Sequence, residues 1–363
     1  DQAILAWQKV LSLKPDDADT YSNIGTILQQ QGKFIEGMKA FSKALSLNPD
    51  HYYANNNMGN AFHMQGEFDN AIEAYSKALS LSPNNASIYL NIGNALQDKG
   101  KASEAIEAYS KALSIKSDYA EAFGNMGAAL YKLGNISDAI KAYSKALDLK
   151  SDYPQAYVNL GLALKDQGKT GKAIDAYATA ISLKTDYVEA YSCLGDALRG
   201  IGFTRANPDL QVIINSMLKG KIYVVPKMIS ASVISLLKFE TSVVELFKKH
   251  SADEIGQSLQ TVIAGLSGVP LLLTLMSVCP INDLKLEACL TDIRAHLLLS
   301  VSQPLTFSEV LLFQSALALQ CFTNEYIYAQ TDIETNALRS LEIAVKKMLS
   351  NGEQPSPQAI LCL

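Results

Sequence analysis

The chain has 363 residues, 18% of them charged and 48% hydrophobic, and this composition excludes both a disordered chain and a fibrous one. Its length has room for two domains of ordinary size. A formal net charge of −5 at pH 7 gives no electrostatic argument for a nucleic-acid partner or an anionic membrane surface.

The cysteines give no sign of a disulfide framework or a zinc site. Five are present, widely spaced and without a Cys-x-x-Cys pair: Cys193, Cys279, Cys289, Cys321 and Cys362. Reduced thiols of a cytoplasmic protein are the simpler interpretation. No signal peptide is visible, but the chain opens at Asp1 without a methionine. We interpret it as an excised fragment and draw no conclusion about a leader.

A five-residue pattern recurs every 34 residues through the first half of the chain. It starts at Tyr21, and its edited copies start at Asn55, Tyr89, Phe123, Tyr157 and Tyr191. Within one copy, Tyr21, Ile24 and Leu28 lie on one face of a helix, because they are spaced by three and four residues. Gly32 interrupts this stripe, and a second stripe through Phe41 and Ala44 follows. The period predicts helix hairpins, each stacked on its neighbours.

Each position within the unit has a predicted role. Glycines at the helix contact permit close approach, while an aromatic residue of the second helix, such as Tyr75 or Tyr109, fills the gap. The predicted N-caps of the first helices are 34 residues apart: Asp16, Asp50, Asn84, Asp118, Asp152 and Asp186. Pro154 fits the first turn of its helix. At Asn207-Pro208 the array is expected to end or to have its last helix rebuilt.

These units resemble tetratricopeptide repeats over about residues 1–206. The departures are mild, among them Asn55 at the first aromatic place and Gly37 at the mid-helix alanine. The resemblance implies an all-α fold, a right-handed α-solenoid of helix hairpins with a half repeat, five full repeats and a partial sixth. It also implies that the first helix of each hairpin lines the concave surface.

Asparagine occupies the place two residues after the leading aromatic in five copies: Asn23, Asn57, Asn91, Asn125 and Asn159. A carboxamide is both donor and acceptor, so it can pair with the N–H and the C=O of a peptide. Helices packed ~10 Å apart and an extended chain rising ~3.3 Å per residue give one asparagine per about three ligand residues. The array resembles O-GlcNAc-transferase-type repeats, in which such a ladder holds extended polypeptide.

Neighbouring side chains extend the candidate peptide-binding set. Asn60 and Asn94 join the ladder as peptide-binding candidates, and further groove candidates are Asn56, Gln29, His63, Gln97, Tyr131 and Lys165. Their charges are mixed, so no Arg/Lys clamp for a terminal carboxylate is predicted. A second interpretation stays open. Asparagine is common at the ladder position of this repeat, where it supports the contact between helices.

Residues 207–363 lose the period but keep helical patterning, which predicts an all-helical domain of linker type. The predicted helices span 209–218, 226–237, 241–249, 254–264, 271–278, 283–300, 307–328 and 334–349. The uncharged stretch 255–282 is the one candidate membrane span. Its longest strongly apolar part, residues 269–279, is about half of the ~20 residues that a span needs. A buried helical hairpin is therefore favoured there.

Motifs of catalysis are missing from the sequence. It contains no Gly-rich phosphate loop, GxSxG, HExxH or kinase signature. The four histidines, His51, His63, His250 and His296, lack metal-ligand spacing. His296 and Cys321 lie in apolar helices and are interpreted as structural. We expect no catalytic residue, no cofactor and no metal, so the chain as given is not predicted to be an enzyme.

A second resemblance concerns residues 315–329, SALALQCFTNEYIYA. This stretch resembles a helical segment of bacterial proteins that join tetratricopeptide repeats to a C-terminal AdoMet-dependent methyltransferase domain. In that family a Gly-rich AdoMet-binding loop follows the segment, and no such loop occurs before Leu363. By this resemblance Asn324, Glu325 and Tyr326 would pack within the helical domain or face the missing domain.

Three functions follow from these patterns. The first is a protein-interaction module that binds an extended polypeptide in the concave groove, with neither nucleic acid nor membrane as partner. The alternative is the substrate-recruiting N-terminal part of a longer bacterial methyltransferase or, with less support, a glycosyltransferase. The third is homo-oligomerisation through the apolar face around Ile4 and Trp7 at the N-terminal end.

Overall fold

The structure is a computed structural model that describes residues 2–220, 225–299, 308–323, 332–351 and 354. Every regular element in these ranges is helical, which confirms the predicted all-α fold. By contact the chain divides into two compact units, residues 1–176 and 177–363, and the division falls inside α11. The predicted division after residue 206 follows the sequence period rather than contacts, and it stays a prediction.

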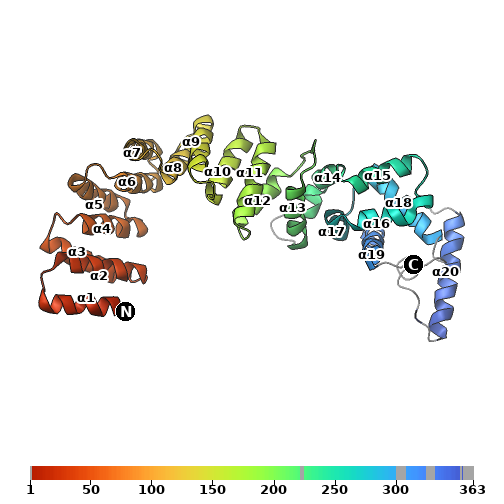
Figure 1. Ribbon diagram of the computed structural model, residues 1–363, viewed down its shortest axis with the longest axis horizontal. Helices are drawn as coiled ribbons and strands as arrows, with labels where there is room; N and C mark the ends of the chain where they lie inside the picture. Colours follow the sequence, from red (N-terminus) through yellow and green to blue (C-terminus); the bar gives the residue numbers. More distant parts are fainter. Residues whose placement is uncertain (1, 221–224, 300–307, 324–331, 352–353, 355–363) are drawn as a thin grey trace. The chain divides into compact units, whose positions relative to one another are not determined.

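The first unit is a row of helix hairpins, which Figure 1 shows in chain order from α1. A single helix, α1 (Gln2–Leu13), precedes the first hairpin. The first helices of the hairpins are α2 (Ala18–Gln30), α4 (Tyr52–Met64), α6 (Ala86–Asp98), α8 (Ala120–Lys132) and α10 (Pro154–Asp166). The second helices are α3 (Phe34–Leu47), α5 (Phe68–Leu81), α7 (Ala102–Ile115), α9 (Ile136–Leu149) and α11 (Thr170–Leu183).

Glycine forms the turn inside each hairpin. Gly66 and Gly100, for example, have φ values of +77° and +89°, a region that residues with a Cβ rarely adopt. The N–H of Gly66 donates to the carbonyl of His63, and that of Gly100 to the carbonyl of Gln97. The first helix therefore ends where the sequence places this glycine, as predicted.

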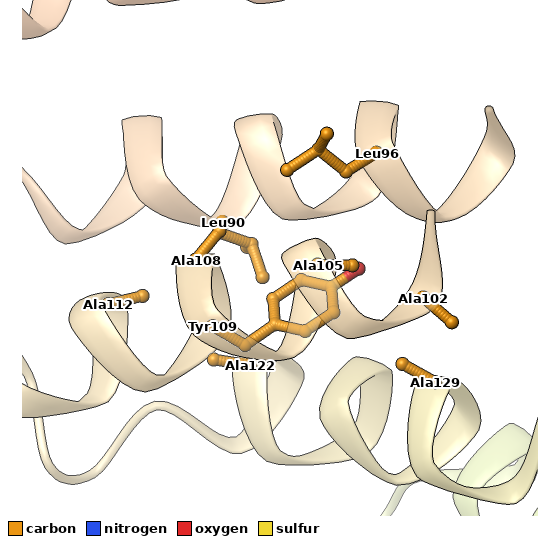
Figure 2. Close-up of a cluster of buried hydrophobic side chains, with 9 residues drawn as sticks. All are labelled: Leu90, Leu96, Ala102, Ala105, Ala108, Tyr109, Ala112, Ala122 and Ala129. Atoms are coloured by element: carbon orange, nitrogen blue, oxygen red, sulfur yellow. The ribbon is translucent and has the colours of Figure 1, made fainter. Parts of the chain in front are cut away.

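The aromatic residue of each second helix lies at the centre of its hairpin. Tyr75 is 1% exposed and Tyr109 is 0% exposed. Figure 2 shows the ring of Tyr109 on α7 with leucines of α6 on one side and alanines of α8 on the other. A Cβ on Gly59 would lie 2.6 Å from the ring of Tyr75, so only glycine fits there. The predicted pairing of glycine with an aromatic is therefore present.

The predicted N-caps are wrong by one residue. Each first helix is capped at the following position, by Asp17, His51 and Asn85 in the first three repeats. The Asn85 side chain accepts from the N–H groups of Ser87 and Ile88, which leaves Asn84 exposed in the preceding turn. A sequence with two adjacent polar residues does not show which of them precedes the first helical turn.

Tyrosine replaces the polar cap in the later repeats. Tyr119, Tyr153 and Tyr187 stand at the cap position without a side-chain capping hydrogen bond. Lysine ammonium groups lie over their rings instead, at 4.7 Å for Lys116 on Tyr119 and 5.4 Å for Lys150 on Tyr153. The ring of Tyr153 also lies against Gly124 on the first helix of the preceding repeat. Packing between repeats thus takes the place of a cap.

The second unit contains the remainder of the array and the non-repeat helices. Its complete helices are α12 (Val188–Ala197), α13 (Pro208–Gly220), α14 (Pro226–Leu237), α15 (Thr241–Ser251), η1 (Gly256–Ser258), α16 (Leu259–Ser267), α17 (Pro270–Val278), α18 (Leu284–Leu299), α19 (Ser308–Thr323) and α20 (Asp332–Ser350). Over the described residues these helices lie close to those predicted for residues 207–363; residues 300, 307 and 324–328 of the predicted helices lie outside the described residues. The difference is at 254–264, where a 3-10 turn precedes α16.

Pro208 begins a helix rather than interrupting one. α12 ends at Ala197, and Gly200 adopts a φ of +70° after it. The side chain of Asn207 then accepts a hydrogen bond from the N–H of Leu210 at 3.0 Å. Asn207 thereby caps α13, whose first residue is the proline. A new helix thus begins at Pro208, while the prediction that the repeat array ends at Asn207-Pro208 or has its last helix rebuilt there stays a prediction.

α17 is the central helix of the second unit. It contacts α13, α14, α16 and α19, and Leu272 and Leu275 on it are fully buried. The buried side chain of Gln320 on α19 binds its C-terminal end. Gln320 Nε2 donates to the carbonyls of Met276 and Cys279, and Gln320 Oε1 accepts from the N–H of Ile281. This one carboxamide satisfies backbone groups that the end of a buried helix leaves unpaired.

In the described part of the chain, no single helix has the length and apolar composition that crossing a membrane requires. One bent pair, Gly256–Ser267 and Pro270–Val278, passes by length and composition when taken together, with an 88° bend between its helices.

Candidate functional site

The first helices of successive repeats face one another along one side of the first unit. α2 contacts α4, α4 contacts α6, α6 contacts α8 and α8 contacts α10, whereas successive second helices make fewer contacts. A stack that is closer on one side curves toward that side. The inner wall of the first unit is therefore built from its first helices.

Three ladder asparagines lie half-buried between these helices and donate hydrogen bonds across the repeats. Asn57 Nδ2 donates to Thr26 Oγ1 at 3.1 Å. Asn91 Nδ2 donates to Asn60 Oδ1 at 3.4 Å, and Asn125 Nδ2 donates to Asn94 Oδ1 at 2.8 Å. In each case the acceptor is the residue three positions after the ladder position of the preceding repeat. The ladder thus supports the contact between helices, as the second interpretation expected.

The buried tyrosines complete two of these contacts. Tyr75 Oη donates to Asn60 Oδ1 at 2.8 Å, and Tyr109 Oη donates to Asn94 Oδ1 at 2.9 Å. Each carboxamide oxygen therefore accepts from a phenol of its own repeat and from an asparagine of the next repeat. We call these two arrangements the carboxamide triads: Tyr75–Asn60–Asn91 and Tyr109–Asn94–Asn125.

Burial keeps the phenols in the form that donates. It raises the pKa of Tyr75 and of Tyr109 above the ordinary value. Both hydroxyls therefore keep their protons well above neutral pH. Because a phenol with its proton can donate here, the oxygens of Asn60 and Asn94 are held toward the second helices.

Two kinds of polar atom in the triads are left for a ligand. Within the described part of the chain, Oδ1 of Asn91 and of Asn125 accepts no hydrogen bond, and neither atom is buried. Nδ2 of Asn60 and of Asn94 likewise donates to no described residue and is not buried. Each triad thus presents one acceptor and one donor, the two groups that a peptide unit requires.

The outer ladder positions differ from the two central ones. Asn23 is exposed, and its side chain makes no hydrogen bond within the described residues. Asn57 Oδ1 accepts from Asn56 Nδ2 at 3.3 Å, and Asn159 Oδ1 accepts from Gln155 Nε2 at 3.2 Å. Ala128 stands where Asn60 and Asn94 stand in the preceding repeats, so Asn159 has no carboxamide to bind there. The five asparagines are equivalent in sequence but not in structure.

Two of the other groove candidates join neighbouring repeats, and a third joins the two helices of its own hairpin. The His63 ring lies 2.8 Å from Asp98 Oδ2, and Tyr131 Oη donates to Asp166 Oδ2 at 2.5 Å. Gln97 Oε1 accepts from Tyr109 Oη at 3.1 Å. Among the residues that the structure describes, Gln29 Nε2 is buried without a hydrogen-bond partner, and Lys165 is half-buried on α10. These residues form a second polar row beside the ladder.

Sequence reasoning missed the role of the tyrosine hydroxyls. It treated Tyr75 and Tyr109 as apolar filling, although each hydroxyl joins a triad. One signal was present in the sequence. The first repeat pairs Thr26 with Phe41, whereas the second and third repeats pair asparagine with tyrosine at the same places.

The cysteines and His296 of residues 207–363 were candidates for a reactive role, and where the structure describes them they are buried or packed against neighbouring residues. Burial raises the pKa of the Cys279 thiol and that of the Cys289 thiol to about 11. His296 Nε2 lies 3.4 Å from Asp292 Oδ1, and its ring covers Gly256. The side chain of Cys321 and residues Asn324, Glu325 and Tyr326 lie outside the described residues.

Family models of one repeat match the N-terminal part of the chain. A TPR repeat model matches residues 1–32, 59–100, 93–134, 127–168 and 161–202. Two further tetratricopeptide repeat models match residues 18–51 and 40–73. Together these matches cover residues 1–202, more than half of the 363 residues. The chain belongs to the tetratricopeptide repeat family. Tetratricopeptide repeat proteins are generally protein-interaction modules.

Solved structures of tetratricopeptide repeat proteins are similar to part of the chain. YrrB, described as having an unusual peptide-binding site, is 20% identical, with 51% of this chain and 95% of YrrB covered and a TM-score of 0.43. MamA of Desulfovibrio magneticus RS-1 is 19% identical, with 47% and 96% covered and a TM-score of 0.44. TTC0263 of Thermus thermophilus is 20% identical, with 50% and 99% covered and a TM-score of 0.42. A search of curated proteins finds no match.

Proposed function

We propose that the inner wall of the tetratricopeptide repeats binds an extended polypeptide through its asparagine ladder. The observation that carries this proposal is the pair of accessible groups in each triad, Oδ1 of Asn91 with Nδ2 of Asn60 and Oδ1 of Asn125 with Nδ2 of Asn94. Structural and binding roles coexist because each carboxamide has more than one hydrogen-bonding group. The structural use of one group leaves the other accessible.

The mixed charge of the wall favours recognition of backbone over side chains. Asp98 lies beside His63, Asp166 lies beside Tyr131 and Lys165 is half-buried on α10, so charges of both signs are present among these side chains. Backbone groups are common to all peptides, so weak dependence on ligand sequence is expected. Affinity then comes from several hydrogen bonds made together, each contributing about 0.5–1.5 kcal/mol.

The experiment that tests the proposal is a binding titration with a defined probe. Random 15-residue peptides displayed on phage are selected against the full chain, and the most enriched peptide is synthesised with a fluorescent label. The double variant Asn91→Ala, Asn125→Ala is expected to weaken anisotropy binding of this peptide at least tenfold. Unchanged affinity would show that the ladder is not the binding surface.

Asn70→Ala is the matched control. Asn70 is exposed on a second helix and donates only to Glu67 of the same hairpin, so its removal leaves the inner wall intact. Its affinity for the peptide should equal that of the parent protein. Circular dichroism and urea unfolding of all three proteins separate lost binding from lost folding.

The remaining alternatives stay predictions. The described part of α19 gives a structural role to Gln320, which adds no support for a linker to a methyltransferase domain. For self-association through the face around Ile4 and Trp7, Trp7 is half-buried and Leu5 and Leu13 on the same helix are exposed, while the side chain of Ile4 lies outside the described residues. Light scattering of the protein with and without residues 1–15 measures this self-association directly.

A further inference from the structure

We infer, on the basis of the proposed function, that the two carboxamide triads recognise two backbone N–H groups three residues apart in an extended ligand. Tyr75 and Tyr109 are positioning residues for this recognition. The inference goes beyond a general ladder, because it selects two of the five asparagines and assigns a direction to each carboxamide.

The direction follows from the bonds that each triad makes. Asn125 uses Nδ2 to bind Asn94 Oδ1 at 2.8 Å, so its own oxygen is turned the other way, because the two atoms branch from one carbon. Asn91 Nδ2 is shared between Asn60 Oδ1 at 3.4 Å and Asn56 Oδ1 at 3.5 Å. The oxygen of both ladder residues therefore remains as an acceptor, and the ligand group that pairs with this oxygen is an N–H.

The tyrosine hydroxyls hold the partner carboxamides in place. Asn94 Oδ1 accepts from Tyr109 Oη at 2.9 Å, and Asn60 Oδ1 accepts from Tyr75 Oη at 2.8 Å. A carboxamide held only by the neighbouring asparagine could turn over and offer its NH2 group to that asparagine's NH2 group. The phenol is a second donor to the same oxygen, so turning the carboxamide over would break two hydrogen bonds instead of one.

The spacing of the two acceptors sets the ligand register. The two ladder residues stand on neighbouring first helices, whose axes are about 8–10 Å apart in packed helices. Three residues of extended chain span about 10 Å. A helical peptide is excluded, because its interior N–H groups are already bonded to its own carbonyls. The ligand is an extended segment without proline at these two positions, since proline has no N–H.

The same geometry limits the site to the second, third and fourth repeats. The first repeat has Phe41 in place of the tyrosine, so no phenol is available there. The fourth repeat has Tyr143 but Ala128 in place of the asparagine, and Asn159 Oδ1 is already bonded to Gln155. Neither end of the ladder can form a triad.

The first experiment is an N-methylation scan of the phage-selected 15-residue peptide. N-methylation removes one backbone N–H at a time and leaves every side chain unchanged. We expect two positions, three residues apart, at which methylation weakens binding roughly tenfold, with smaller effects at the two positions between them. A scan with no sensitive pair, or with a pair at another spacing, would overturn the inference.

The second experiment uses the phenols, since Tyr75→Phe and Tyr109→Phe remove only the hydroxyls. Because the hydroxyls act through Asn60 and Asn94, the double variant should weaken peptide binding by about fivefold or more. Tyr143→Phe is the matched control, because the same buried tyrosine there has Ala128 opposite it. Equal peptide affinity of the parent protein, the Tyr75→Phe, Tyr109→Phe variant and the Tyr143→Phe variant would overturn the positioning role of the two tyrosines.

A spectroscopic measurement separates positioning from general stability. In 15N-labelled protein, the side-chain NH2 resonances of Asn91 and Asn125 should shift in the Tyr75→Phe, Tyr109→Phe variant and stay unchanged in Tyr143→Phe. Failure of the proposed function itself looks different. In that case Asn91→Ala, Asn125→Ala binds the peptide as the parent does, whereas failure of this inference alone leaves that double variant weak and the phenol variants normal.

Discussion

The ring of Tyr75 occupies the space that a side chain on Gly59 would need, because a Cβ there would lie 2.6 Å from two ring atoms. Gly59 and Tyr75 belong to the two helices of one hairpin, so this contact sets how closely α4 and α5 approach. The same relationship recurs between Gly127 and Tyr143, at 2.8 Å. The hairpins therefore share one spacing, on which the regular stack depends.

Gly59→Ala is expected to destabilise the array by about 1–3 kcal/mol, because the added methyl group forces apart two helices that are already in contact. Gly171→Ala is the control. Gly171 lies in α11 with no heavy atom within 4 Å of its Cβ position, so alanine there should be neutral or stabilise by up to about 1 kcal/mol. Urea unfolding followed by circular dichroism measures both. Equal midpoints for the two variants would contradict the close contact.

Removing the Tyr109 ring should cost far more than removing its hydroxyl. Tyr109→Ala empties a fully buried site between α6 and α8 and is expected to cost about 3–5 kcal/mol. Tyr109→Phe keeps the ring and loses only the hydrogen bonds to Asn94 and Gln97, at about 1 kcal/mol. Denaturant titrations of the two variants give both values. Similar losses would mean that the hydroxyl, not the ring, stabilises the hairpin.

Stability is expected to fall above about pH 10. Burial raises the pKa of Tyr75, Tyr109 and Tyr143 above the ordinary value, whereas the unfolded chain has the ordinary value near 10. The contribution of the protonated phenols is complete below that pH and is lost above it, because the unfolded chain then releases protons that the folded chain keeps. Urea midpoints of the parent and of the triple Tyr→Phe variant between pH 8 and about 11 test this. Lysine titration affects both proteins, so parallel curves would refute the assignment to tyrosine.

Asn85→Ala should destabilise the third repeat, whereas Asn84→Ala should not. Asn85 caps α6 and donates to Tyr52 Oη at 2.6 Å, so its loss is expected to cost about 1–2 kcal/mol. Asn84 is exposed, and its replacement is expected to change stability by less than about 0.5 kcal/mol. Thermal melts of the two variants decide which asparagine is the cap.

Gln320→Leu is expected to destabilise the second unit by about 2 kcal/mol or more. Leucine retains much of the volume but leaves the N–H of Ile281 and the carbonyls of Met276 and Cys279 without the partner that Gln320 supplies. Hydrogen exchange should then increase at the end of α17 and not in the repeats. Ser315→Ala, an exposed change on the same helix, is the control.

The sequence predicted the hairpins well because the features that define them are local and repeated. Gly66 and Gly100 mark turns by their own conformational freedom, and Tyr75 opposite Gly59 follows from the size of two side chains. The caps were predicted one residue too early. In the third repeat Asn84 and Asn85 are chemically the same, and only the backbone distinguishes them. In other repeats aspartate was preferred as a cap over the histidine or tyrosine that follows it.

The candidate site was predicted in composition but not in arrangement. The period of 34 identified Asn91 and Asn125, yet it made them equivalent to Asn159. Their difference depends on Ala128, which lies on another helix 31 residues earlier in the chain. The use of Gln320 could not be predicted either, because its partners at Met276 and Cys279 are brought near it only by the packing of α19 on α17.

The residue at the start of each first helix determines whether the junction between two repeats suits one neighbour or several. His51 and Asn85 bind Asp19 and Tyr52 of the repeat before them, so each of these two junctions suits one specific neighbour. Tyr119, Tyr153 and Tyr187 instead meet the same kind of lysine three residues earlier, so their junctions are interchangeable. Copies of 34 residues could therefore be inserted or removed between Tyr119 and Tyr187 with little strain. The same change among the first three repeats would break the contact of His51 with Asp19 or that of Asn85 with Tyr52.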